Sequence, residues 1–150
     1  MNIGAFALIT VIGGRGEGRV NISDYRGLGY RHPYAAVAMS LFLFSLAGIP
    51  PTGGFIGKFY IFSAAVKEGY VGLAVIGVLN SVVAVYYYLR VTIAMYMEET
   101  PGEREAEVPA LVFSPAIILA ICISAYGVLS LGLFPASYVS IVKQSFLALQ

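Results

Sequence analysis

The chain has 150 residues, of which 59% are hydrophobic and 11% charged, and its mean hydropathy is +0.82. Soluble domains usually carry about 25% charged residues, so this composition indicates an integral membrane protein of the helical kind. The formal net charge of +1 gives nucleic-acid binding no electrostatic basis. The single cysteine, Cys122, cannot form an internal disulfide, and the sequence holds no Cys/His spacing typical of a metal site.

Residues 1–12 are apolar, but a helix of that length is only about 18 Å long, and a hydrocarbon core is about 30 Å thick. We therefore expect a partial transmembrane helix there. The segment 13–32 is polar and is expected to form a loop. His32 precedes Pro33, and we interpret it as a solvated interfacial residue rather than a ligand, because no partner cluster accompanies it. The arginines of this segment are Arg15, Arg19, Arg26 and Arg31.

Residues 33–66 predict one membrane span made of two half-helices. Pro33 suits the first turn of a helix, whereas Pro50 and Pro51 lack the N–H groups that a continuous helix needs. Each proline also disfavours helical angles in the residue before it. We expect the helix to break between Gly48 and Gly54 and to resume near Phe55. The residues assigned to the break are Gly48, Pro50, Pro51, Gly53 and Gly54.

The break leaves the carbonyls of Leu46 and Ala47 without their helical donors. Inside a bilayer such groups must be satisfied by protein or by water, so we expect polar side chains or water beside them. Lys58 lies about one turn into the second half-helix, and a lysine near the bilayer centre costs about 2.5–3.5 kcal/mol. Because broken helices often mark ion pathways, Lys58 is the candidate functional residue. The alternative is a lysine that snorkels, or that pairs with a carboxylate for structure alone.

Residues 70–97 predict a long helix of about 40 Å, which must tilt or project into the interface. Asn80 and Tyr87 are seven residues apart and share a face that would point at the break and line a channel. Packing between helices is the alternative, and the commoner role of such a face.

The last third of the chain predicts an acidic loop over 98–112 and a membrane helix over 113–134. The tail 135–150 is expected to lie along the membrane interface as a short amphipathic helix. Orientation follows from the distribution of lysine and arginine. The loops 13–32 and 98–112 together carry more of these residues than the opposite side. They are therefore expected to be cytoplasmic, with the C-terminus outside.

These features predict an all-α fold, a polytopic transmembrane helix bundle with one discontinuous helix, in a single membrane domain over 1–150. The stretch FLFSLAGIPPTGGFIGKFYIF, followed by NSVVAVYYYLR, resembles the antiporter-like membrane subunits of proton-pumping NADH–quinone oxidoreductase (respiratory complex I). Within them, YYYLR points to subunit N. MNIGAFALIT and DYRGLGYRHP also fit, so the resemblance extends over essentially the whole chain. It corresponds to the C-terminal third of that family's proteins.

The resemblance implies a subunit of an H⁺-translocating NADH:quinone oxidoreductase that takes part in redox-driven proton translocation. Lys58 would be the distal proton-carrying lysine of a half-channel that opens to the outer side. The family's other channel residues, a glutamate and two lysines on earlier helices, do not occur in this chain.

No cofactor is expected on the chain, since NADH, flavin, iron–sulfur clusters and quinone belong to partner subunits. The implied partners are other membrane subunits, the lipid bilayer and protons, in a bacterial or archaeal cell membrane.

Two other functions stay open. The first is a subunit of a multisubunit Na⁺/H⁺ antiporter that works without redox partners, against which YYYLR argues. The second is a structural membrane fragment without transport, in which the break is a packing kink. A lysine beside the break is a costly device for packing alone, which disfavours that alternative.

Overall fold

The structure is a computed structural model that describes residues 1–13, 21–97, 111 and 113–147, and all regular elements in these ranges are helical. This confirms the predicted all-α class. The helices, in chain order, are α1 (Asn2–Gly13), the 3₁₀ turn η1 (Ile22–Tyr25), α2 (Leu28–Arg31), α3 (Pro33–Ala47), α4 (Gly53–Lys67), α5 (Val71–Met97), α6 (Pro115–Leu133) and α7 (Pro135–Leu147).

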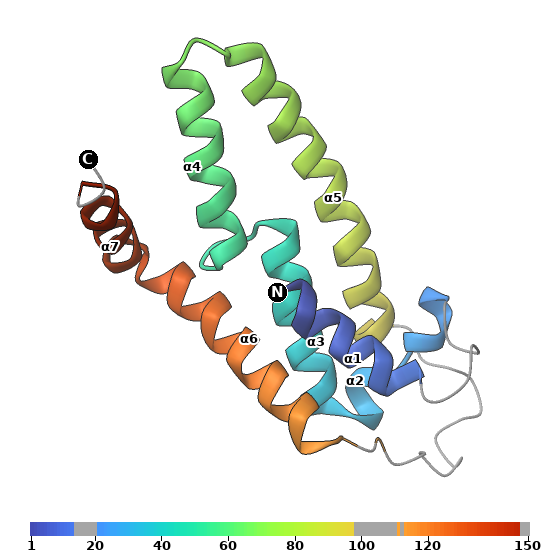
Figure 1. Ribbon diagram of the computed structural model, residues 1–150. Helices are drawn as coiled ribbons and strands as arrows, with labels where there is room; N and C mark the ends of the chain where they lie inside the picture. Colours follow the sequence, from blue (N-terminus) through green and yellow to red (C-terminus); the bar gives the residue numbers. More distant parts are fainter. Residues whose placement is uncertain (14–20, 98–110, 112, 148–150) are drawn as a thin grey trace.

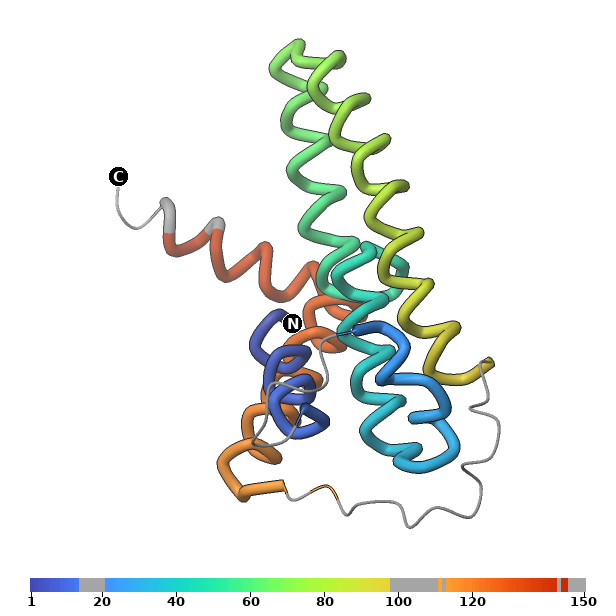
Figure 2. The backbone as a smooth tube through the Cα atoms, turned by 90° about the vertical axis from the view of Figure 1, so that its right-hand side faces the viewer, coloured from blue at the N-terminus to red at the C-terminus, as the bar shows by residue number. Residues whose placement is uncertain are grey.

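The molecule has two parts that meet at the junction of α3 and α4 (Figure 1). At one end, α4 and α5 form a helical hairpin, in which the ring of Phe62 lies where a side chain at Gly77 would be. At the other end, α1, α3, α6 and the lower half of α5 pack around a core. Phe42, Leu8 and Met95 are its largest fully buried side chains. The junction therefore lies in the middle of the molecule (Figure 2).

The segment predicted as the polar loop 13–32 contains two short helical turns, η1 and α2, in its described part from residue 21 onward. Tyr25 and Leu28 are buried against the core. The N–H of Gly27 donates to the carbonyl of Ala94 at 3.4 Å, which ties this segment to the end of α5. The described part of the predicted loop thus contains short helical turns, because two apolar side chains among the charges anchor it, and its cytoplasmic placement stays a prediction.

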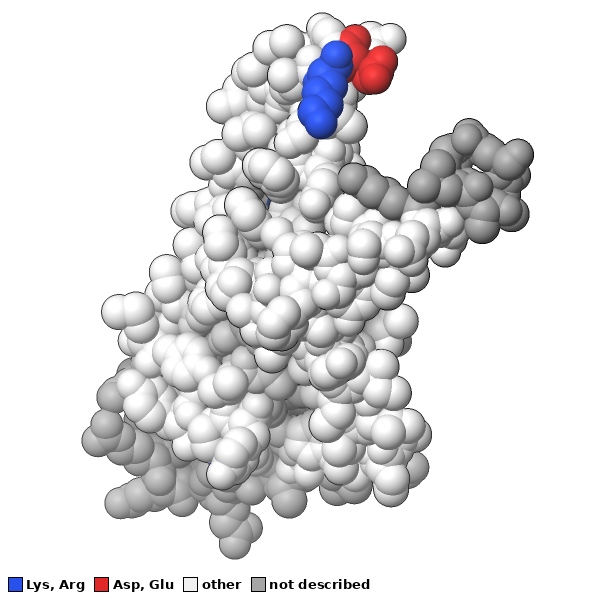
Figure 3. Space-filling view, turned by 90° about the vertical axis from the view of Figure 1, so that its left-hand side faces the viewer, with Lys and Arg blue, Asp and Glu red and all other residues white. Residues whose placement is uncertain are grey.

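Two helices, α5 and α6, are long and apolar enough to cross a membrane, among the residues that the structure describes. Few residues of either helix are buried within the described structure, unlike the core helices of soluble proteins. The apolar helices α1 and α3 are shorter. On the face drawn in Figure 3, the visible charged side chains gather at the tip of the α4–α5 hairpin, where Lys67 and Glu68 lie. The rest of that face, outside the grey atoms, is almost entirely uncharged.

The later elements begin and end close to the predicted residues. α5 covers Val71–Met97 where 70–97 was expected, and α6 covers Pro115–Leu133 where 113–134 was expected. Of the predicted acidic loop 98–112, only Leu111 lies within the described residues. The tail forms α7, which points away from the bundle (Figure 2). Its placement along a membrane interface stays a prediction.

Candidate functional site

Helix α3 ends at a glycine C-cap, Gly48. Gly48 adopts φ 85° and ψ 39°, a left-handed conformation that glycine allows without a steric cost. Its N–H donates to the carbonyls of Phe44 and Ser45, and the N–H of Ile49 donates to Phe44 at 3.0 Å. This is the Schellman arrangement that commonly ends a helix. It satisfies the terminal carbonyls of Phe44 and Ser45 and leaves those of Leu46 and Ala47 without a backbone donor.

Lys58 supplies the donors for those two carbonyls. Its Nζ lies 3.2 Å from the oxygen of Leu46 and 2.9 Å from the oxygen of Ala47. A side chain at Gly48 would bring its Cβ within 3.0 Å of the lysine Cδ, so glycine leaves room for the lysine stem. The sequence predicts a polar group beside these carbonyls, and the structure shows that this group is the candidate lysine itself. The ammonium thus faces the C-terminal end of α3, which carries partial negative charge.

The start of α4 also donates a hydrogen bond to the last turn of α3. The fully buried Ser45 accepts a hydrogen bond from the N–H of Gly54 at 3.2 Å, and its Oγ donates to the sulfur of Met1 at 3.2 Å. Thr52 donates from Oγ1 to the carbonyl of Ile49 at 2.7 Å. Side chains from both helices therefore satisfy the backbone groups that the interruption exposes.

The break is shorter than the sequence predicts, because α4 begins at Gly53 rather than near Phe55. Gly53 and Gly54 lie in the first helical turn, where they permit close packing and are not needed for turn angles. A side chain at Gly54 would run into the carbonyl of Ser45, and one at Gly53 would come within 3.0 Å of Leu131.

Helix α6 covers the interruption from the other side. A side chain at Gly132 would meet the carbonyl of Pro51 and lie within 2.7 Å of the Thr52 Cα. The Pro50–Pro51 peptide bond is cis. That α3 and α4 together form a single membrane span stays a prediction.

A groove of about 880 Å³ runs between α4 and α5 and contains Lys58. Lys67 lines it near the hairpin turn, and Ser63 and Ser81 are polar residues along it. The remaining lining is apolar and includes Phe55, Phe59, Phe62, Val78, Val82 and Val85.

Asn80 and Tyr87 are exposed and do not line this groove. Tyr87 instead makes an edge contact with Tyr86, with ring centroids 5.7 Å apart. Ser81, the neighbour of Asn80, is the α5 residue that brings a hydroxyl to the groove, where it donates to the carbonyl of Gly77 at 3.0 Å. A channel role for Asn80 and Tyr87 stays a prediction.

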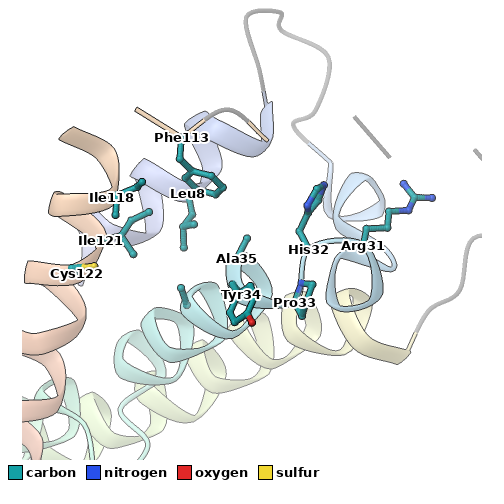
Figure 4. A pocket seen from close by; sticks show the side chains of 11 residues that line it. Leu8, Arg31, His32, Pro33, Tyr34, Ala35, Phe113, Ile118, Ile121 and Cys122 are labelled. Atoms are coloured by element: carbon teal, nitrogen blue, oxygen red, sulfur yellow. The ribbon is translucent and has the colours of Figure 1, made fainter. Parts of the chain in front are cut away.

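A second cavity, of about 450 Å³, lies between α1, α3 and α6 (Figure 4). Leu8, Phe113, Ile118 and Ile121 approach it from one side, whereas Arg31 extends away from it. It contains no cluster of reactive groups. Within the described ranges, no group of three or more His, Cys, Asp or Glu residues is placed to hold a metal ion.

Sequence reasoning missed the serine and glycine that support the site. Ser45 lies inside α3, nine residues before its partner Gly54, so its hydrogen bond to the start of α4 depends on how the two helices pack. Gly132 stands in an apolar helix without any turn signal, so only the packing against Pro51 reveals its role.

Comparison with known proteins yields one family and a consistent set of relatives. The family described as NADH:quinone oxidoreductase/Mrp antiporter, TM matches residues 1–84. NADH-quinone oxidoreductase subunit N of Trichlorobacter lovleyi is 50% identical over 97% of this chain and 29% of its own length. Subunit N of Chloroflexus aggregans is 40% identical over 99% of the chain and 29% of its own length.

A solved structure is also similar. A chain of respiratory complex I from Thermus thermophilus with bound aureothin superimposes with a TM-score of 0.65 and 31% sequence identity. The match covers 78% of the present chain and 26% of that one. The chain described here therefore spans less than a third of the length of the relatives it matches.

Proposed function

Because the chain belongs to the NADH:quinone oxidoreductase/Mrp antiporter transmembrane family, we propose that it takes part in redox-driven proton translocation as the C-terminal part of an antiporter-like subunit. It is a multi-pass helical membrane protein. The subunit is that of an NADH–quinone oxidoreductase, as the names of the relatives suggest. The electron-transfer chemistry would lie on partner subunits, with no redox site on this chain.

One observation carries the proposal. The Nζ of Lys58 donates hydrogen bonds to the carbonyls of Leu46 and Ala47, which the helix interruption leaves without backbone donors. Among the described residues, the hydrogen-bond partners of the ammonium are this carbonyl pair, which carries no fixed negative charge that would trap the proton. Lys58 also faces the groove between α4 and α5. The proton of Lys58 would move along that groove, which leads toward the hairpin turn.

Proton transfer through Lys58 requires both a charged and a neutral state of its side chain. In the charged state, the ammonium has three donors, of which two reach carbonyls and one is left for the groove. In the neutral state, the amine nitrogen has a lone pair that can take a proton back. A lysine can alternate between these states, whereas a residue of fixed charge cannot.

A Na⁺/H⁺ antiporter subunit is the alternative function, because the family description includes the Mrp antiporters. The names of the curated relatives favour the oxidoreductase. A purely structural role is the other alternative, since a lysine that only caps α3 would make the same two hydrogen bonds.

Proton translocation in the intact oxidoreductase tests the proposal. Lys58→Ala should reduce NADH-driven proton uptake into sealed inverted vesicles by more than about tenfold, as expected for loss of a proton-transfer group. Lys67→Ala removes the same charge from the hairpin end of the groove and should lower the uptake much less than Lys58→Ala does. Wild-type uptake in the Lys58→Ala complex would refute the proposal. Uptake that needs Na⁺ and no NADH would favour the antiporter.

A further inference from the structure

We propose that Ser45 and Gly54 are positioning residues, which hold the start of α4 against the end of α3 so that Lys58 reaches the two carbonyls. The inference rests on the proposed role of Lys58 in proton transfer. It adds two residues that touch no proton themselves and act through the lysine.

The first step is the geometry of α4. Gly54 and Lys58 are four residues apart, so they lie on one face of the helix, one above the other. The backbone N–H of Gly54 donates to Ser45 Oγ at 3.2 Å, and Nζ of Lys58 donates to the carbonyls that follow Ser45 in the chain. This face of α4 therefore donates to the last turn of α3 at two levels, one turn apart.

The second step is the closeness of the two helices where Gly54 meets Ser45. A Cβ at Gly54 would overlap the carbonyl of Ser45, so the backbones approach as closely as glycine permits. Ser45 is fully buried, and its hydroxyl proton points to the sulfur of Met1. Its oxygen lone pair is therefore left for the N–H of Gly54.

The third step is the length of the hydrogen bonds that Lys58 donates to the carbonyls of α3. The contact of Lys58 Nζ with the Leu46 oxygen is 3.2 Å, at the long end of the N–H···O range. The lysine stem passes close to Gly48, where an added Cβ would lie 3.0 Å from Cδ, so this path is open only because the residue is glycine. An outward shift of α4 would therefore separate Nζ from at least one carbonyl.

The chain offers a matched control for each positioning residue. Ser40 is a buried serine of the same helix, and its hydroxyl donates to the carbonyl of Ala36 within α3. Gly57 is a glycine of α4 whose added Cβ would meet nothing within 4 Å. Ser40→Ala and Gly57→Ala therefore change the same residue types without touching the contact between α3 and α4.

The experiment compares Ser45→Ala and Gly54→Ala with these controls in the intact, assembled oxidoreductase. The first readout is the distance from Lys58 Nζ to the Leu46 and Ala47 oxygens, measured by cryo-electron microscopy of each variant. The second is the number of protons taken up per NADH oxidised. We expect both positioning variants to lose at least one of the two contacts and to lower the proton ratio more than twofold, while both controls keep the wild-type values.

Several results would overturn the inference. If Lys58 keeps both contacts in both variants, Ser45 and Gly54 do not position it. If the contacts are lost and the proton ratio stays normal, the position of the lysine does not matter to transport. Failure of Ser45→Ala to assemble, with Ser40→Ala intact, would assign Ser45 to folding instead. Because the distances are independent of transport, a normal proton ratio in Lys58→Ala would refute only the proposed function.

Discussion

Replacing Lys58 by arginine separates the two roles that the structure allows for this side chain. A guanidinium keeps the positive charge and has five donors in a planar fork, enough for the carbonyls of both Leu46 and Ala47. It does not lose its proton in a protein. Lys58→Arg should therefore preserve the capping of α3 and abolish proton transfer, whereas Lys58→Met should abolish both.

The magnitudes follow from the two hydrogen bonds. Leaving a buried carbonyl without its donor costs about 1–3 kcal/mol, so Lys58→Met should cost about 2–6 kcal/mol in the stability of the α3–α4 junction. Ala47 is buried, whereas Leu46 and Lys58 are half-buried, so the middle of this range applies. In water, the pKa of arginine lies about 2–3 units above that of lysine, so proton release should be about 10²–10³-fold less favourable in Lys58→Arg.

Two assays read these effects separately. Proton uptake into sealed vesicles, driven by NADH, reports transfer, and the heat-induced loss of this subunit from the purified complex reports the junction. Lys58→Arg should assemble and resist heat like the wild type and yet take up few protons. Wild-type proton uptake in Lys58→Arg would show that a fixed charge suffices, and it would refute the assignment of Lys58 as a proton carrier.

Three further predictions test the surroundings of the lysine. Replacing both Pro50 and Pro51 by alanine supplies backbone N–H groups that compete with Lys58 for its carbonyls, so proton uptake should fall in a complex that still assembles; full transport would refute this. Gly132→Ala should weaken the packing of α6 on Pro51 and lower the thermal stability of the complex, whereas Gly127→Ala, with open space around its added Cβ, should not; wild-type thermal stability in Gly132→Ala would show that α6 tolerates the added volume. In a Cys122→Ser background, a cysteine at Gly69 should react with an impermeant thiol reagent added outside and one at Ser23 should not, and the reverse pattern would invert the predicted orientation.

The position of the interruption could be predicted from the sequence because its cause is local. Proline removes specific backbone donors at specific positions, and the two prolines fix which carbonyls of α3 lose their partners. The same logic predicted a polar group beside those carbonyls. It could not identify the group as Lys58, since the lysine is eleven and twelve residues away and its reach depends on how α4 folds back on α3.

Other features were beyond sequence reasoning because packing, not propensity, decides them. Gly53 and Gly54 were assigned to the break, but they begin α4 and serve its contacts with α3 and α6. Asn80 and Tyr87 share one face of α5, as their spacing predicts, but the helix turns a neighbouring face, with Ser81, toward the groove. Periodicity shows which residues share a face, and only the packing shows what that face meets.

The hydrogen bonds at the junction make the interruption and the lysine one unit. The two carbonyls have lost their helical donors, and their hydrogen-bond partner is a side chain whose charge can change. Hydrogen bonds from a charged donor are roughly twice as strong as those between neutral groups, so the charged lysine binds α3 to α4 more tightly than the neutral amine would. If Lys58 carries a proton, each release therefore also weakens the link between the two helices. A helix that continued through the break would supply its own donors and would have no such dependence.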